Sequence, residues 1–193
     1  MNKGYQHIIL VTDGSKTSRS AEETAVHLAT QHKAKVIIVD TVRPPSFASQ
    51  WLTSNSKELF DVIISDSTDP IGPGGALFTS DFYTACKKCL KPDGILVTQN
   101  GVAFMQPDEV STTYKRLQPH FKDHTFYSAA IPTYIGGIMT FAWGTDNTQA
   151  RQLQLETLQQ RYQAANIKTR YYNPAIHLAS FALPQYVLDT IEH

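Results

Sequence analysis

Residues 60–75 read FDVIISDSTDPIGPGG, an apolar run that leads straight into two aspartates. The run at 61–65 is rich in β-branched residues, which predicts a strand buried on both faces. Asp66 ends this strand, and Asp69 follows three positions later. Because the sheet fixes the end of a strand, both carboxylates can point into one cleft. The stretch therefore predicts a polar site at the edge of a sheet.

The chemistry of this aspartate loop has more than one interpretation. Two close carboxylates suit a dicationic ligand, since one can hold an ammonium group while the other accepts a proton from an attacking amine. Alternatively, DSTDP (66–70) is an Asx-type turn whose oxygens cap local N–H groups. A magnesium site is the weaker interpretation, because no histidine is nearby in sequence and phosphate would usually join such a site. We expect no bound metal.

Strands and helices alternate on both sides of this stretch. Residues 7–12 (HIILVT) and 34–42 (AKVIIVDTV) predict buried strands with an amphipathic helix at 16–32 between them, which makes a parallel βαβ unit. The whole pattern indicates an α/β fold with a doubly wound, mostly parallel sheet that ends in an antiparallel strand pair. The other predicted elements are helices at 46–60, 78–94, 108–121 and 148–165, strands at 95–99, 126–133 and 138–145, and two short tail helices divided by Pro184.

Composition narrows the class of protein. The chain has 193 residues, 41% of them hydrophobic, which suits one α/β domain with a sizeable core. Seventeen basic residues balance seventeen acidic ones, so no net charge favours nucleic acid or anionic lipid. No apolar run reaches the roughly 20 residues of a membrane helix, and we expect a cytoplasmic protein. Cys86 and Cys89 are expected to be reduced thiols on one helix.

Three motifs in the second part of the chain carry a resemblance to a known family. They are DSTDPIGP (66–73), IPTYIGG (131–137) and YYNPAIH (171–177). In this combination they resemble bacterial spermidine synthases, which are polyamine aminopropyltransferases, from about Asp61 to the end of the chain. The resemblance implies the Rossmann-like sheet found in methyltransferases and aminopropyltransferases.

The resemblance also implies a reaction. These enzymes transfer the aminopropyl group of decarboxylated S-adenosylmethionine to putrescine, giving spermidine and methylthioadenosine. By resemblance Asp66 is the base that takes the amine's proton, Asp69 holds the diamine, Pro73 lines the nucleoside pocket and Tyr134 contacts the diamine chain. The sulfonium nucleoside is a co-substrate, so no cofactor is expected.

Other aromatic residues have packing roles in this interpretation. Tyr134 could instead be a strand-end residue packed against the aspartate loop. Trp143 is read as a core or interface residue. The motif at 171–177 is read as a turn that fixes the C-terminal helices, with His177 as a structural residue rather than a base.

Residues 1–60 do not resemble a spermidine synthase; they resemble the start of a universal stress protein. In that family the residue at Asp13 lies at the adenine end of an ATP site, but the later phosphate loop has no counterpart here. The glycine-rich nucleoside loop of synthases is not visible either. We therefore interpret the chain as a join near Phe60–Asp61, with a stress-protein-like βαβ segment at 1–60 and the C-terminal part of a synthase catalytic domain at 61–193, merged into one α/β domain.

The front segment offers two residues for a hybrid nucleoside site. Asp13 begins a strand-to-helix turn, where a helix N-terminus offers free N–H groups. Asp40 ends the next strand, 27 positions later, where a ribose-binding acid would stand. Both are therefore candidate nucleoside-binding residues.

The leading functional expectation is aminopropyl transfer between a nucleoside sulfonium and a small diamine, with low or absent turnover because the front of the site is not recognisable. The alternatives are a nucleotide-binding protein of the universal stress type and an inactive partner of intact synthase subunits. The sequence leaves open which amine is preferred and whether the chain forms a homo-oligomer.

Overall fold

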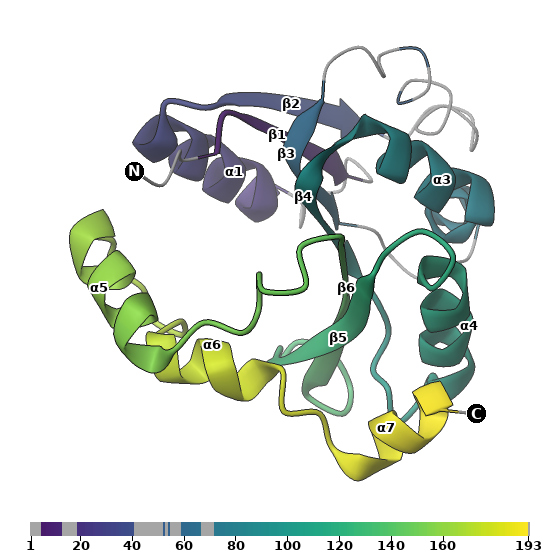
Figure 1. Ribbon diagram of the computed structural model, residues 1–193. Helices are drawn as coiled ribbons and strands as arrows, with labels where there is room; N and C mark the ends of the chain where they lie inside the picture. The colour runs from purple at the N-terminus through teal and green to yellow at the C-terminus, as the bar shows by residue number, and fades with distance from the viewer. Residues whose placement is uncertain are drawn as a thin grey trace.

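The computed structural model has an α/β fold built on one six-stranded sheet (Figure 1). Asp13 and Asp69 lie outside the described residues, which are 5–12, 19–40, 52, 54, 59–66 and 72–192. The strands are β1 (His7–Thr12), β2 (Lys35–Asp40), β3 (Phe60–Asp66), β4 (Leu90–Gln99), β5 (Asp123–Ala130) and β6 (Ile138–Thr145). The helices are α1 (Arg19–His32), the 3-10 helix η1 (Gly72–Phe78), α3 (Ser80–Cys89), α4 (Pro107–Leu117), α5 (Leu155–Ala165), α6 (Pro174–Ser180) and α7 (Gln185–Glu192).

The order of strands across the sheet is β2-β1-β3-β4-β6-β5. Strands β2, β1, β3 and β4 run parallel, whereas β6 runs antiparallel to both β4 and β5. This arrangement confirms the predicted Rossmann-like sheet that ends in an antiparallel pair. The strands on both sides of Phe60–Asp61 belong to this one sheet, since β1 pairs with β3.

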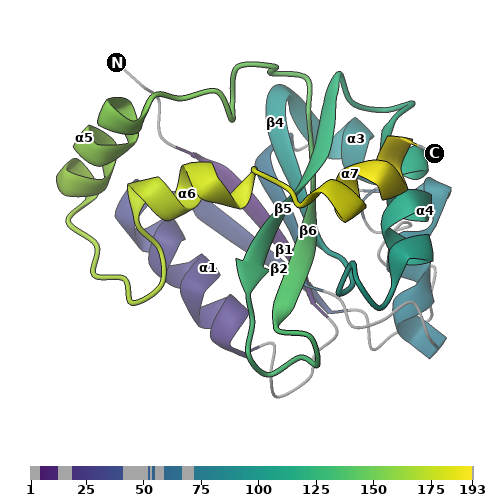
Figure 2. The same ribbon diagram turned by 90° about the horizontal axis from the view of Figure 1, so that it is seen from below.

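Helices cover both faces of the sheet. Helices α3, α4 and α7 lie on one side, and α1, α5 and α6 lie on the other (Figures 1 and 2). The main apolar core lies against the first of these faces, which we call the packed face. It contains Ile63 and Leu96, which are neighbours in the sheet, and Phe82 of α3, all at most 1% exposed.

The opposite face, which we call the open face, is covered less completely. Pairing places Ile64 beside Val97 and Val97 beside Trp143, so their side chains share one face of the sheet. All three are only half-buried. The difference between the two faces leaves room beside β4 and β6 on the side of α6.

One helix begins later than the sequence pattern predicts. A helix was expected over 148–165, but α5 begins at Leu155. Before it, Asn147 forms an Asx turn in which its side-chain oxygen accepts a hydrogen bond from the backbone N–H of Gln149. Arg151 is then drawn to Asp123 of β5, with Nε 2.9 Å from the carboxylate. These contacts hold the segment outside a helix, although its residues favour one.

At the amino end of β3, Asp61 connects three parts of the chain. Its carboxylate accepts hydrogen bonds from the backbone N–H groups of Gln6 and His7, each 2.8 Å away, and from Lys91 Nζ at 2.8 Å. Burial alone would raise the pKa of Asp61, but the hydrogen bonds from Lys91 and from the two backbone groups outweigh it and lower the pKa below its ordinary value. This cluster ties the start of β1 to β3 and β4.

Candidate active site at the carboxyl ends of the strands

The carboxyl ends of three parallel strands place two of the predicted acids in one row. Thr12 at the end of β1 pairs with Asp40 of β2 on one side and with Asp66 of β3 on the other. Each of the three is the last residue of its strand. In a doubly wound sheet this edge is where ligands bind, so the fold brings the strand ends with Asp40 and Asp66 to the expected place.

Asp66 is held at this edge by the strand that precedes it. Ser65, the residue before it, is 1% exposed, whereas Asp66 itself is half-buried. The carboxylate therefore belongs to a residue that the sheet fixes but that solvent reaches. Such a position combines accurate placement with access for a ligand.

Tyr134 reaches this edge from the connection between β5 and β6. Its hydroxyl accepts a hydrogen bond of 3.4 Å from Gln99 Nε2, and Gln99 ends β4, the neighbour of β3. Tyr134 is 43% exposed, so it is not packed away as a core residue. The contact brings the fourth strand end and Tyr134 to the same edge as Asp66.

The turn that carries Tyr134 is tightly hydrogen-bonded. The N–H of Ile131 donates to the carbonyl of Gly137 at 2.8 Å, and the N–H of Gly137 donates to the carbonyl of Tyr134 at 3.0 Å. Gly136 and Gly137 have φ values of 95° and 72°, which side chains rarely tolerate. The GG pair therefore permits the reversal that presents Tyr134.

Two residues at this edge were missed by the sequence analysis, Gln99 and the adjacent Asn100. Asn100 is 2% exposed, and neither atom of its side-chain amide has a hydrogen-bond partner among the described residues. Its backbone is fixed by a hydrogen bond from its N–H to the carbonyl of Thr140. The available signal was the QNG sequence (99–101) at the end of a predicted strand, which follows in the chain the strand that ends at Asp66.

The remaining predicted site residues are only partly described. Pro73 belongs to η1, which follows the aspartate loop, and Asp40 is placed by its backbone at the end of β2. Asp13 and Asp69 lie outside the described ranges. Across the described residues, no three His, Cys, Asp or Glu side chains gather closely enough to hold a metal ion.

Two family models match the chain. The model described as spermine/spermidine synthase domain matches residues 48–154, which is more than half of the chain. The chain belongs to this family. The second match is to the universal stress protein family over residues 4–59, and it covers the front strands β1 and β2.

Individual relatives agree with the family match. The polyamine aminopropyltransferase of Salmonella arizonae is 60% identical over 138 residues, which are 72% of this chain and 48% of that protein. The corresponding protein of Salmonella schwarzengrund is 59% identical over the same length. The chain thus spans about half the length of the curated relatives it matches.

Solved structures support the fold. A crystal structure of spermidine synthase in complex with the transition-state analogue AdoDATO superimposes with a TM-score of 0.74 at 22% identity, covering 98% of this chain and 70% of that one. The spermidine synthase of Thermotoga maritima gives a TM-score of 0.71 at 21% identity. Within the described part of the chain, no helix is long and apolar enough to cross a membrane.

Proposed function

We propose that this chain transfers an aminopropyl group from decarboxylated S-adenosylmethionine to a small diamine such as putrescine. The observation that carries the proposal is the place of Asp66, half-buried at the carboxyl end of β3, within a segment that is 60% identical to a polyamine aminopropyltransferase. Tyr134 and Gln99 flank the same edge. An acid and an aromatic ring together suit an alkylammonium ligand.

The proposed reaction is a nucleophilic displacement at a carbon atom. The unprotonated nitrogen of the diamine attacks the carbon next to the sulfonium sulfur, a carbon–nitrogen bond forms, and the carbon–sulfur bond breaks with its electron pair going to sulfur. Methylthioadenosine leaves, and Asp66 takes the proton released by the nitrogen. Asp69 holds the second, charged end of the diamine. The gain in rate then comes from alignment and from proton removal.

The nucleoside is proposed to bind at Asp40, Asp13 and Pro73, at the same sheet edge as the diamine site at Asp66. Since β1 alone separates β2 from β3, the Cα atoms of Asp40 and Asp66 are about 10 Å apart. That separation leaves room for a ribose at Asp40 while the reacting carbon faces Asp66. Titration calorimetry with methylthioadenosine tests the assignment: we expect heat of binding that Asp40→Asn weakens, and no heat at millimolar ligand contradicts it.

We further propose that the chain combines a universal-stress-type front with a synthase-type back, joined near Phe60–Asp61 into one domain. The two family matches overlap over residues 48–59, just before this point, and β1 pairs directly with β3 across it. A front of different origin would place the nucleoside less accurately, so we expect slow turnover.

The deciding experiment is incubation of stoichiometric protein with decarboxylated S-adenosylmethionine and putrescine, followed by mass spectrometry. Spermidine and methylthioadenosine should form together in equal amounts. Omitting putrescine is the control for spontaneous breakdown of the sulfonium, which gives methylthioadenosine alone. Equal methylthioadenosine with and without putrescine, and no spermidine, contradicts the proposal.

A second candidate is nucleotide binding of the universal stress type, which the match at residues 4–59 favours. It predicts binding of ATP or AMP and no aminopropyl transfer. Calorimetric titration with ATP beside methylthioadenosine separates the two, since the first proposal requires the sulfur nucleoside to bind more tightly. Cytoplasmic location, homo-oligomer formation and the absence of a nucleic-acid partner stay predictions.

A further inference from the structure

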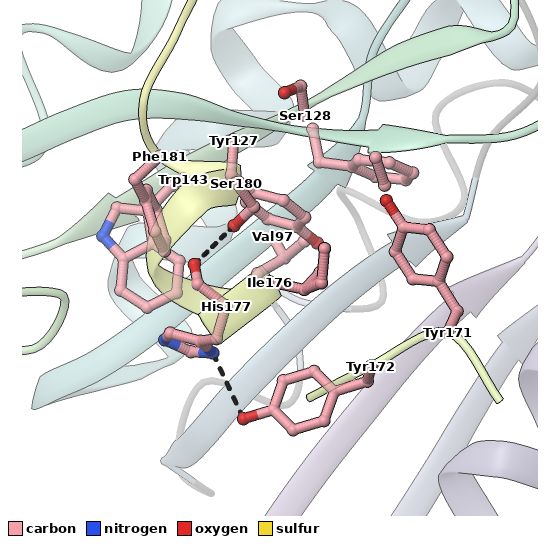
Figure 3. A pocket seen from close by; sticks show the side chains of 12 residues that line it. Val97, Tyr127, Ser128, Trp143, Tyr171, Tyr172, Ile176, His177, Ser180 and Phe181 are labelled. Atoms are coloured by element: carbon pink, nitrogen blue, oxygen red, sulfur yellow. Dashed lines mark hydrogen bonds between the residues drawn. The ribbon is translucent and has the colours of Figure 1, made fainter. Parts of the chain in front are cut away.

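The open face of the sheet carries a cavity of about 380 Å³ between β4, β5, β6 and α6 (Figure 3). Val97 and Trp143 form part of its floor, and His177 and Phe181 contribute to its wall from α6 and the residue that follows it. A volume of this size lies in the range of small-molecule sites. The proposed transfer reaction assigns no role to these residues.

The cavity is built mainly from rings that hold one another in place. Seven of its twelve described lining residues carry an aromatic or imidazole ring. Tyr127 stacks on Phe141 with centroids 5.1 Å apart and planes 14° apart, and Trp143 meets Phe181 edge-on at 5.5 Å. Because the rings contact each other in pairs, their faces are oriented before any ligand arrives.

The charge of the lining decides the class of ligand. None of the described lining residues is Asp, Glu, Lys or Arg. The aromatic faces can attract a cation, but no carboxylate compensates for the water that an ionised ligand gives up, so the lining favours an uncharged ring. His177 is half-buried, and burial lowers its pKa, so the imidazole stays neutral at neutral pH. Its Nδ1 lies 3.4 Å from the hydroxyl of Tyr172.

We propose that this cavity is a second binding site, specific for an uncharged, flat aromatic molecule of about two fused rings. The ligand lies against the fixed rings of the sheet and α6, and one of its polar atoms hydrogen-bonds to His177 or Tyr172. Val97 precedes Gln99 by two positions on β4, so the cavity lies about 7 Å along the strand from the edge that carries Asp66. The two sites are neighbours on one face but use different residues.

The test compares two probes of the same size that differ in charge, 2-methylquinoline and N-methylquinolinium, by titration calorimetry in mildly alkaline buffer. We expect 2-methylquinoline to bind at one site with a dissociation constant below about 1 mM, and the cation to bind at least about tenfold more weakly. Absence of saturable binding, or equal or tighter binding of the cation, overturns the proposal.

Matched variants locate the site. Ser180→Phe on α6 fills the cavity and should abolish binding, whereas Ala179→Phe on the exposed side of the same helix should leave it unchanged. Binding that survives Ser180→Phe overturns the proposal. If Ser180→Phe does not fold, an NMR titration of the unmodified protein with 2-methylquinoline replaces it. The indole N–H resonance of Trp143, assigned by its absence in Trp143→Phe, should shift saturably. A resonance that does not shift overturns the proposal. Asp66→Asn should bind the probe normally, which keeps this test separate from the transfer reaction.

Discussion

Strand β3 carries an aspartate at each end, and the two differ in what surrounds them. Asp61 at the amino end accepts hydrogen bonds from Gln6, His7 and Lys91 of its own chain. Asp66 at the carboxyl end pairs in the sheet with Thr12 and lies beside the strand end that contacts Tyr134. The same side chain on the same strand therefore serves assembly at one end and, in our proposal, chemistry at the other.

The difference follows from the direction of the parallel strands. All carboxyl ends of β2, β1, β3 and β4 meet at one edge, where loops leave the sheet and a ligand can enter. At the opposite edge the residues that begin β1 and β4 lie close to β3, and the carboxylate of Asp61 accepts hydrogen bonds from both. Substitutions at the two ends should consequently separate stability from activity.

The largest expected effect is that of Asp66→Asn on the rate of transfer. An amide cannot accept the proton released by the attacking nitrogen, so the single-turnover rate should fall by about 10²–10⁴-fold. The free energy of unfolding should fall by about 1 kcal/mol or less, because the residue is half-buried at a strand end. Rapid-quench measurement of methylthioadenosine and a urea titration give the two values.

Asp61→Asn is the matched control for that substitution, since it makes the same chemical change on the same strand. It should leave the single-turnover rate within about twofold of the wild-type rate when the two proteins are compared at the same folded fraction. A loss of rate in Asp61→Asn as large as that in Asp66→Asn would mean that the proton acceptor lies elsewhere and that Asp66 acts through the fold.

The next largest effect is on the free energy of unfolding, through Asp61 at the amino end of β3. Asp61→Ala removes the acceptor of two backbone N–H groups and of Lys91, and should lower the free energy of unfolding by about 2 kcal/mol. Lys91→Met removes only the ion pair and should cost about 1 kcal/mol or less. Urea unfolding measures both, and equal losses would assign the whole effect to the ion pair.

The sequence predicts the two ends of β3 with unequal success. Strand ends were predictable, because short apolar runs stop at Asp40 and Asp66 and parallel strands bring such ends together. The role of Asp61 was not, because its partners Gln6 and Lys91 lie 55 and 30 positions away. The contact of Gln99 with Tyr134 likewise depends on β6 returning beside β4, which local periodicity does not encode.

Long-range contacts also explain why the predicted start of α5 was wrong and why the sequence did not predict the cavity. Arg151 leaves the helical pattern because Asp123, 28 positions earlier, attracts it. Trp143 was predicted as a core or interface residue, and it is half-buried against Phe181. Its contribution to a cavity depends on where α6 lies, and α6 contacts the sheet through residues far apart in sequence.

A smaller effect concerns how the stabilisation by Asp61 depends on pH. The pKa of Asp61 is lower in the folded protein than its ordinary value of 3.8, so the ionised carboxylate favours folding. Its contribution is complete above that value and is lost as the pH falls through the lowered folded-state pKa. The difference in unfolding free energy between the wild type and Asp61→Asn should therefore be constant near neutral pH and shrink below pH 3.8. A constant difference throughout would contradict the ionic origin.

The smallest expected effect concerns the hydroxyl of Tyr134. Its hydrogen bond with Gln99 is long, at 3.4 Å, so Tyr134→Phe should raise the KM for putrescine by about threefold or less, which corresponds to at most about 0.7 kcal/mol. Tyr134→Ala also removes the ring face offered to the alkylammonium chain, and should raise KM by about tenfold more than Tyr134→Phe does. Steady-state kinetics with varied putrescine measures both. If the two variants behaved alike, Tyr134 would serve only to hold Gln99, and the ring would have no part in binding the diamine beside Asp66.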